Sequence, residues 1–334
     1  MAKRGLCFSS HDPEKPLSEK DALFLAATGL DPRTPRPTEA ELTMLAGAGI
    51  SWFYNWGRTP KVEGPAGGAP WTSGTGGMDF VPMLHKLSSS TSEVRAVVAS
   101  NPAIRHLLVL NEPSHRKQAW ASPEEAATHW PEWERLAREL NLSLVGPQLA
   151  YGGQQEHKNP VDWMNAFLTA YRSEHNGCEP KVDAIGFHFY GSHGLWKNLD
   201  LLKEAFHKPI WLTEFSRYNA TSVDEQKAWM KKHVRVCEKH PSVERYSWFI
   251  ARSVKHPHLA LLGADGALTE LGQYYASLPR ARANTAAAAA EGEGGAPSAD
   301  EAECEGGVPS DAEAEGEGGA LAGGGSSSAA SGDP

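Results

Sequence analysis

Eight short apolar segments, separated mostly by stretches with helical signals, constrain the fold of this chain more than any other feature. Most of the segments are bounded by glycine, proline or polar residues, as buried strands usually are. Strands that alternate with helices form a parallel sheet, and eight of them predict an α/β fold, the (β/α)8 TIM barrel. The expected strands are Lys3–Ser9, Ile50–Asn55, Asp79–Met83, Leu107–Asn111, Ser143–Pro147, Ala184–Phe189, Ile210–Thr213 and Arg245–Ile250.

Helix start signals lie between most of these segments. Capping residues or prolines begin expected helices at Thr38, Ser122, Pro160, Ser222 and Thr269. Ser222 and Glu225 also have the spacing of a capping box. The segment Arg58–Met78 is rich in glycine and proline and has no helical period, so we expect an irregular loop there in place of a regular second helix.

Residues 281–334 differ in composition from the rest of the chain. They are almost entirely Ala, Gly, Glu, Ser, Asp and Pro, and they include no aromatic residue. Such a stretch buries too little apolar surface to offset the entropy of ordering, so we expect a disordered tail. The tail carries eleven acidic residues and one arginine, whereas the whole chain has a formal charge of −9. We therefore expect one nearly neutral barrel domain over residues 1–280, an acidic tail, and no nucleic-acid partner.

Cysteine spacing and hydropathy limit the setting in which the protein works. The four cysteines form no CxxC pair and no zinc-ligand spacing, and the histidines are scattered, so we expect neither a metal nor a cofactor. Cys178 and Cys237 can pair if the protein is secreted, with buried free thiols as the alternative. No run is long enough to cross a membrane, and no signal peptide is recognisable. We expect an extracellular monomer, with a cytosolic location as the alternative.

Two glutamates stand at the ends of apolar strand-like runs. Glu112 directly follows the run His106–Asn111, and Glu214 directly follows the run Pro209–Thr213. In a β/α barrel the carboxyl ends of the strands form the catalytic rim. Two carboxylates that meet at one rim suit the cleavage of a glycosidic bond, as acid/base and nucleophile. A surface ion pair or a solvated rim glutamate is the alternative for either residue alone.

Aromatic and neutral polar residues gather at the other strand ends. A pyranose ring presents C–H faces that stack on aromatic rings, and its hydroxyl groups need neutral hydrogen-bond partners. Asn111 is placed to bind the hydroxyl next to the anomeric carbon, where a hydrogen bond strengthens in the transition state. Packing inside the barrel is the alternative role for these residues, particularly for the histidine. The further candidates for sugar binding are Tyr54, Asn55, Trp56, Gln148, His188, Tyr190 and Trp248.

Taken in order, the strand ends resemble glycoside hydrolase family 128, the alkali-sensitive-linkage-like glycosyl hydrolases, many of them from fungal cell walls. The resemblance covers about residues 4–278 and excludes the tail. No single motif is specific, but the ordered set is. The matching motifs are Gly5-Leu6, Phe53–Gly57, Phe80–Met83, Leu110–Pro113, Gly186–Gly191, Trp211–Phe215 and Val243–Phe249.

The resemblance implies a (β/α)8 barrel, a retaining mechanism and β-1,3-glucan as the substrate. It implies that Glu112 is the acid/base, that Glu214 is the nucleophile and that Asn111 binds a sugar hydroxyl. It also places Trp56, Tyr190 and Trp248 at aromatic subsites. Two segments depart from the pattern, which leaves the choice between endo and exo action open. They are Leu84–Lys86, where we expect an aromatic residue, and Gln148–Tyr151, where we expect small polar residues.

These observations together favour a retaining endo-β-1,3-glucanase that acts on a β-1,3-glucan polysaccharide or oligosaccharide. For Glu112 to donate a proton while Glu214 attacks, the pKa of Glu112 has to exceed that of Glu214. The alternatives are an exo-acting family member, a β-1,3-glucan-binding protein with little turnover, and a barrel hydrolase of another β-glycan such as mannan or β-1,4-glucan.

Overall fold

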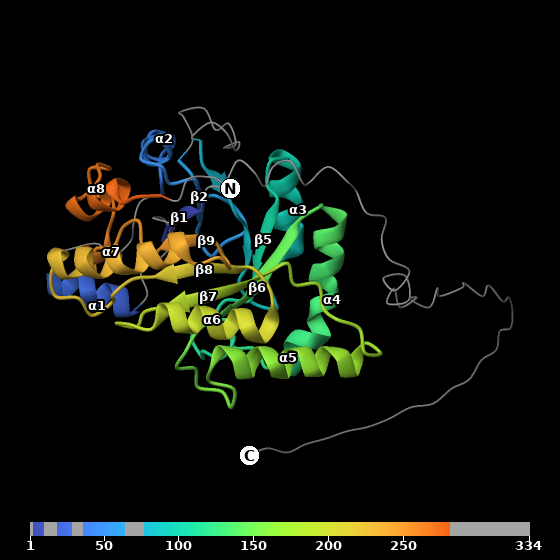
Figure 1. The fold of residues 1–334 in the computed structure, drawn as a ribbon. Helices are drawn as coiled ribbons and strands as arrows, with labels where there is room; N and C mark the ends of the chain where they lie inside the picture. The colour runs from blue at the N-terminus through green and yellow to red at the C-terminus, as the bar shows by residue number, and fades with distance from the viewer. Residues whose placement is uncertain (1–2, 10–18, 29–35, 64–76, 281–334) are drawn as a thin grey trace, which may run out of the picture. The chain divides into compact units, whose positions relative to one another are not determined.

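A computed structural model of the chain describes residues 3–9, 19–28, 36–63 and 77–280 (Figure 1). The predicted tail, residues 281–334, lies outside the described residues. Most of the predicted loop Arg58–Met78 does too, and its described part, residues 58–63 and 77–78, contains no helix. Glu63 forms an isolated parallel bridge with Thr38.

All described strands belong to one parallel sheet. Their order around the sheet is β3-β2-β1-β9-β8-β7-β6-β5-β4. The strands are β1 (Arg4–Cys7), β2 (Trp52–Tyr54), β3 (Asp79–Phe80), β4 (Met83–Leu84), β5 (His106–Val109), β6 (Ser143–Leu149), β7 (Ala184–Phe189), β8 (Ile210–Phe215) and β9 (Val243–Trp248).

The two ends of this strand order, β3 and β4, are separated in the chain by only Val81 and Pro82. The Val81 N–H donates to the carbonyl of Phe53 at 2.9 Å, and the Leu108 N–H donates to the carbonyl of Pro82 at 2.9 Å. The linker therefore bonds to β2 on one side and to β5 on the other, which closes the sheet. The predicted eight-strand TIM-barrel fold is confirmed, with its third strand interrupted by a proline that lacks an N–H.

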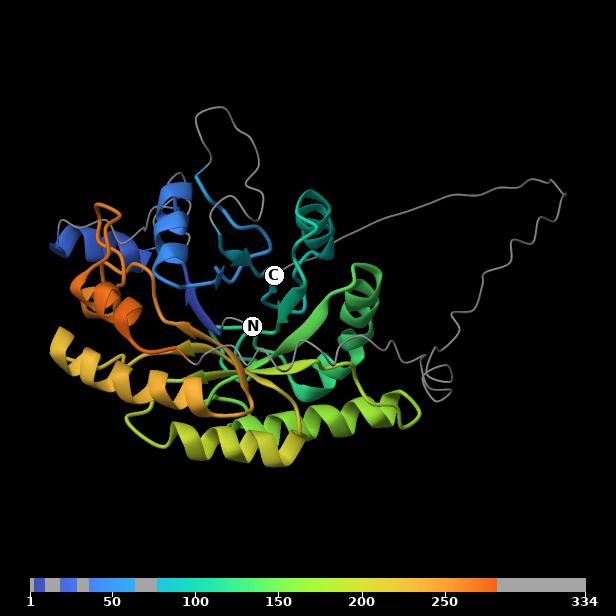
Figure 2. The same cartoon turned by 45° about the horizontal axis from the view of Figure 1, so that its top comes forward.

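Helices cover the outside of the sheet, and the consecutive helices from α4 to α8 pack on one another (Figures 1 and 2). Of the eight, α1, α3 and α6 carry no start signal that the sequence analysis recognised. The helices are α1 (Glu19–Thr28), α2 (Glu39–Gly47), α3 (Thr91–Ser100), α4 (Pro123–Glu139), α5 (Pro160–Glu174), α6 (Leu195–Phe206), α7 (Val223–Lys239) and α8 (Glu270–Ser277), with a short 3-10 turn at Pro257–Leu259.

The helix caps follow the sequence closely. Thr38 and Ser122 both form complete capping boxes with the glutamate three residues later. The predicted box at Ser222 is only half formed. Its hydroxyl accepts from the N–H of Glu225 at 3.2 Å, but the Glu225 carboxylate accepts from the N–H of Thr221 at 2.8 Å, one residue earlier.

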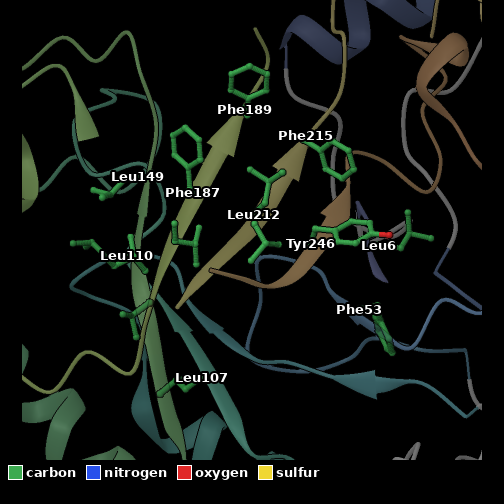
Figure 3. Close-up of a cluster of buried hydrophobic side chains, with 14 of the residues drawn as sticks. Leu6, Phe53, Leu107, Leu110, Leu149, Phe187, Phe189, Leu212, Phe215 and Tyr246 are labelled. Carbon is green, nitrogen blue, oxygen red and sulfur yellow. The ribbon is translucent and has the colours of Figure 1, made fainter. Parts of the chain in front are cut away.

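The side chains of the strands form two apolar layers, because successive residues of a strand point to opposite faces. The outer layer packs between the strands and the helices, and Figure 3 shows members of it such as Phe187, Phe189 and Leu212 on neighbouring strands. The inner layer fills the barrel and includes Cys7, Trp52, Tyr54, Val81, Met83, Leu108, Val145, Ala184 and Trp211.

Aromatic rings and one guanidinium group close the inner layer toward the amino ends of the strands. The ring centroids of Trp52 and Trp211 lie 5.3 Å apart, and Arg245 Cζ lies 4.7 Å from the Trp211 ring. His106 packs on the same ring at 4.8 Å. The barrel interior is thus filled at this end, and polar side chains collect at the carboxyl ends of the strands.

Candidate active site

Glu112 lies just beyond the end of β5. The backbones of Leu110 and Glu112 have positive φ angles of 57° and 44°. The Glu112 N–H donates to the carbonyl of Gln148 at 2.8 Å, and Asn111 forms an isolated parallel bridge with Gln148. The chain after β5 is therefore held against β6, and the Glu112 carboxylate reaches His188 on β7.

Glu214 lies in β8 beside a β-bulge. The pairing of β8 with its neighbours shifts register between Leu212 and Phe215, which both belong to the outer layer. Thr213 and Glu214, between them, both face inward, because a bulge inserts one extra residue into a strand. The Thr213 hydroxyl donates to Gln148 Oε1 at 2.8 Å, which fixes the bulge to β6.

Three donors converge on the Glu214 carboxylate, whose side chain is 6% exposed. Trp56 Nε1 donates to Oε1 at 2.7 Å. The Tyr54 hydroxyl lies 3.3 Å from the same oxygen and 3.0 Å from the carbonyl of Thr213, so its one hydrogen is shared between them. The Tyr190 hydroxyl donates to Oε2. Hydrogen bonds of this kind stabilise the ionised carboxylate and fix its orientation.

His188 connects the two glutamates. Its Nδ1 lies 2.7 Å from Glu112 Oε1 and 3.4 Å from Glu214 Oε2. One carboxylate oxygen of Glu112, one of Glu214 and one ring nitrogen of His188 all lie within 4.8 Å of one another. The structure therefore brings both glutamates to one place at the carboxyl ends of the strands, as the sequence analysis expects.

The electrostatics of these three groups are coupled. Burial lowers the pKa of His188, but the charge of Glu214 and the hydrogen bond that Nδ1 donates to Glu112 outweigh it, so the pKa is raised. Burial raises the pKa of Glu112, yet the hydrogen bond and charge of His188 leave it lowered. The pKa of Glu214 is raised by burial and by the charge of Glu112, although His188 opposes this. These directions run against the expectation that Glu112 has the higher pKa.

Four of the predicted sugar-binding residues contact the glutamates directly: Tyr54, Trp56, His188 and Tyr190. Asn111 directly precedes Glu112 in the chain, and it is almost fully buried. Its Nδ2 donates to Gln118 Oε1 at 3.3 Å, and its Oδ1 has no hydrogen-bond partner among the described residues.

Three other predicted sugar contacts need correction. Trp248 is wholly buried in the outer layer, where its Nε1 donates to the carbonyl of Leu259 at 2.9 Å. Gln148 is also wholly buried, and its Nε2 donates to the carbonyl of Val145 at 2.8 Å. The Asn55 Nδ2 donates to two carbonyls of residues 59–60, and its Oδ1 accepts from Gly57. These side chains shape the site and do not face it.

Sequence reasoning missed three residues near the glutamates. The charges of His115 and His85 both act on Glu112 and lower its pKa. Tyr218, which is 48% exposed, donates or accepts a 2.5 Å hydrogen bond with His256 Nε2 and packs edge-on against Tyr190. Only the position of His85, directly after β4, carried a signal. The tyrosine and His115 lie in loops whose course the sequence does not reveal.

Glu112, His188 and Glu214 also form the one group of three potential metal ligands within the described part of the chain. Nδ1 of the histidine is engaged with Glu112 at 2.7 Å, so a cation could bind there only by displacing this contact. We therefore assign no metal ligands. Cys7 and Cys237 are free and buried, so Cys237 does not pair with Cys178. Among the described helices, none has the length and hydropathy needed to cross a bilayer.

Known proteins are similar to this chain in fold and in sequence. A family model for the glycosyl hydrolase catalytic core matches residues 33–275. A subgroup II endo-β-1,3-glucanase of glycoside hydrolase family 128 from Pseudomonas viridiflava is 33% identical, with a TM-score of 0.68 over 84% of this chain and 98% of that chain. A second one, from Sorangium cellulosum, is 32% identical, with a TM-score of 0.65 over 83% of this chain and 99% of that chain.

A longer relative matches as well. Alkali-sensitive linkage protein 1 of Schizosaccharomyces pombe is 29% identical over 248 residues, which make up 69% of this chain and 40% of that protein. The chain thus spans less than half the length of this relative. The family model covers most of the barrel, and the Pseudomonas enzyme is aligned over nearly its whole length. The chain is therefore a glycoside hydrolase and belongs to family 128.

Proposed function

We propose that the protein is a retaining endo-β-1,3-glucanase that hydrolyses β-1,3-glucan by double displacement. The observation that carries this proposal is the convergence of Glu112 and Glu214, of which one carboxylate oxygen each lies within 4.8 Å of the other at the carboxyl ends of the strands. Retaining enzymes hold their two carboxyl groups about 5–5.5 Å apart, whereas inverting enzymes need about 6.5–9.5 Å to admit a water. The spacing here supports the retaining geometry.

The surroundings of each glutamate favour one role. Glu214 is held by Trp56, Tyr54 and Tyr190, so its carboxylate is fixed in orientation, as a nucleophile requires. Glu112 exchanges a hydrogen bond with a titratable partner, His188, as an acid/base that gains and loses a proton requires. In the first step Glu214 attacks the anomeric carbon while Glu112 protonates the departing sugar oxygen. In the second step Glu112 deprotonates the water that releases the sugar from Glu214.

Two observations support the proposed substrate and the endo mode of action: the described activity of the relatives, and the exposed aromatic residues that follow the strands. The two family members above 30% identity are described as endo-β-1,3-glucanases. Exposed aromatic residues follow three strands of the barrel: Trp120 after β5, Tyr151 after β6 and Tyr218 after β8. Aromatic rings spread along a rim suit a chain of several sugars better than one terminal sugar. No cofactor is required by this chemistry, and β-1,3-glucan is the partner we propose.

The glutamates can be tested on laminarin by the release of reducing sugar. We expect Glu214→Ala and Glu112→Gln each to lower the rate by a factor of at least about 10³, because each removes a group that acts in the transition state. Glu204→Gln, an exposed glutamate on α6, is the matched control and retains the wild-type rate. Full activity in either site variant would exclude the proposal. Binding of the oligosaccharide without hydrolysis by the wild-type protein would favour the binding-protein alternative.

Azide separates the two roles. When Glu214 is replaced by Ala, azide can attack in its place and gives the α-glycosyl azide. When Glu112 is replaced by Ala, azide instead intercepts the glycosyl-enzyme and gives the β-glycosyl azide. Products of the opposite anomeric form would mean that the roles are exchanged. Product lengths on laminarin distinguish endo action, which yields a spread of oligosaccharides, from exo action, which yields one short product.

A further inference from the structure

His188 occupies an unusual position between the two glutamates. It is 2% exposed, and its Nδ1 lies 2.7 Å from Glu112 Oε1 and 3.4 Å from Glu214 Oε2. Its other ring nitrogen, Nε2, has no hydrogen-bond partner among the residues that the structure describes. Within the described part of the chain, the only polar contacts of this buried ring are therefore with the carboxylates that carry out the proposed reaction.

The protonation state of Glu112 in the free enzyme differs from the one that bond cleavage requires. Glu112 has to hold a proton when the glycosidic bond breaks, yet in the free enzyme His188 stabilises its ionised form. The proton that Glu112 needs is nevertheless close. An imidazolium beside a carboxylate and a neutral imidazole beside a carboxylic acid differ only by the position of one proton along the 2.7 Å contact from Nδ1 to Oε1.

We propose that His188 stores the catalytic proton, holding it on Nδ1 in the free enzyme and passing it to Glu112 Oε1 for cleavage of the glycosidic bond. The transfer turns the imidazolium into imidazole and the carboxylate into carboxylic acid. Glu112 then gives this proton to the leaving sugar oxygen as Glu214 bonds to the anomeric carbon. In the second step Glu112 takes a proton from water, the water oxygen displaces Glu214, and the proton returns to Nδ1. This inference rests on the proposed hydrolase function.

Other titratable groups face this cluster, and most of them stay uncharged near neutral pH. The pKa of Tyr54, Tyr190 and Cys7 is raised well above the usual range, chiefly by burial, so all three remain protonated. Burial lowers the pKa of His85, which disfavours its charged form. His115 is the remaining titratable neighbour of Glu112.

His188→Asn tests the proposal, because the Asn amide nitrogen can replace the Nδ1 donor but cannot store a proton. In the wild type, the shared proton is lost only at the raised pKa of the imidazolium, so kcat/KM on laminarin stays high past the ordinary histidine range. In the variant the proton has to reside on Glu112 itself. We therefore expect the alkaline limb of kcat/KM to move to lower pH by about one unit or more, which is about tenfold in rate at pH 8. At pH 5 the loss is smaller.

A dinitrophenyl β-laminaribioside provides the second readout, because its leaving group departs without a proton. We expect His188→Asn to retain most of the wild-type kcat/KM on this substrate at pH 8, while laminarin hydrolysis falls. An equal loss on both substrates, with an unchanged pH profile, would overturn the proposal and leave His188 a purely structural residue. If Glu112→Gln is inactive while this outcome is found, the hydrolase function stands and only the proton store fails.

Nuclear magnetic resonance gives a direct test that does not depend on turnover. With ¹⁵N-labelled histidine, the His188 signals are those lost in His188→Asn. We expect the wild-type ring to be protonated on both nitrogens at pH 7. In Glu112→Gln, which removes one of the two carboxylates, we expect the ring to lose its charge at lower pH. A neutral wild-type ring at pH 6 would contradict the proposal.

Discussion

Tyr190→Phe removes one hydrogen-bond donor from the Glu214 carboxylate and leaves the aromatic ring in place. In the wild type, the Tyr190 hydroxyl donates to Oε2, while Trp56 at 2.7 Å and Tyr54 at 3.3 Å serve Oε1. Without it, Oε2 keeps, among the residues that the structure describes, only the 3.4 Å contact with His188. A hydrogen bond to a charged group contributes about 1.5–3 kcal/mol to stability. We expect a loss of this size in the stabilisation of the ionised carboxylate.

The loss acts on the two chemical steps differently. The hydrogen bond of Tyr190 lowers the pKa of Glu214, so its removal raises that pKa by roughly one to two units at about 1.36 kcal/mol per unit. Glu214 has to be ionised to attack, so the acid limb of kcat/KM moves to higher pH by the same amount. In the second step Glu214 leaves as an anion, and without the donor this departure slows by about ten- to a hundredfold.

Pre-steady-state kinetics on dinitrophenyl β-laminaribioside at pH 8 separate these effects. Attack is little changed at this pH, so kcat and KM fall together and a burst equal to the enzyme concentration appears. Tyr274→Phe on α8 makes the same chemical change away from the site and leaves the kinetics unaltered. A uniform fall of kcat/KM at every pH, without a burst, would show that the lost hydroxyl acts on the substrate and that its bond to Glu214 has no catalytic effect.

Two further predictions concern the scaffold. A methyl group added in Gly186→Ala would lie 1.9 Å from Gln148 Oε1, the atom that accepts the hydrogen bond of Thr213 beside Glu214. We expect the free energy of unfolding in urea to fall by about 1–3 kcal/mol and kcat to fall with it. Unchanged values of both would contradict this role of Gln148. Ser122→Ala removes half of the capping box of α4. We expect the free energy of unfolding to fall by about 1 kcal/mol while kcat/KM stays unchanged. A change in kcat/KM would show that α4 is coupled to the site.

The strand pattern predicted the barrel because each short apolar run between helical segments has few other ways to bury its backbone. The rim position of Glu112 and Glu214 followed from the same pattern, since every strand of a parallel barrel ends at one face. Their distance did not follow, because it depends on the bulge at Thr213 and on the bonds of β6 to both strands. The interruption of the third strand at Pro82 was also invisible, because its two halves read as one apolar run.

The misassigned sugar contacts have a common cause. Both faces of a barrel strand are buried, so the polar and apolar alternation that marks the inner face of other sheets is absent. Trp52 and Trp248 are both wholly buried tryptophans on the two strands that flank β1, yet one fills the barrel and the other packs against the helices. A one-residue change of register exchanges these two environments, and bulges introduce such changes.

The backbone itself is distorted at the strand ends that form the site. Trp56, Leu110 and Glu112 have positive φ angles of 56°, 57° and 44°. This left-handed region of backbone conformation is disfavoured for residues other than glycine. Such conformations cost about 1–3 kcal/mol each and persist only where surrounding contacts enforce them. Here the enforcing contacts are the N–H of Glu112 on Gln148 and the indole of Trp56 on Glu214, at 2.8 Å and 2.7 Å. The bond that orients the proposed nucleophile therefore also holds Trp56 in its conformation, so changes at either residue are expected to be non-additive.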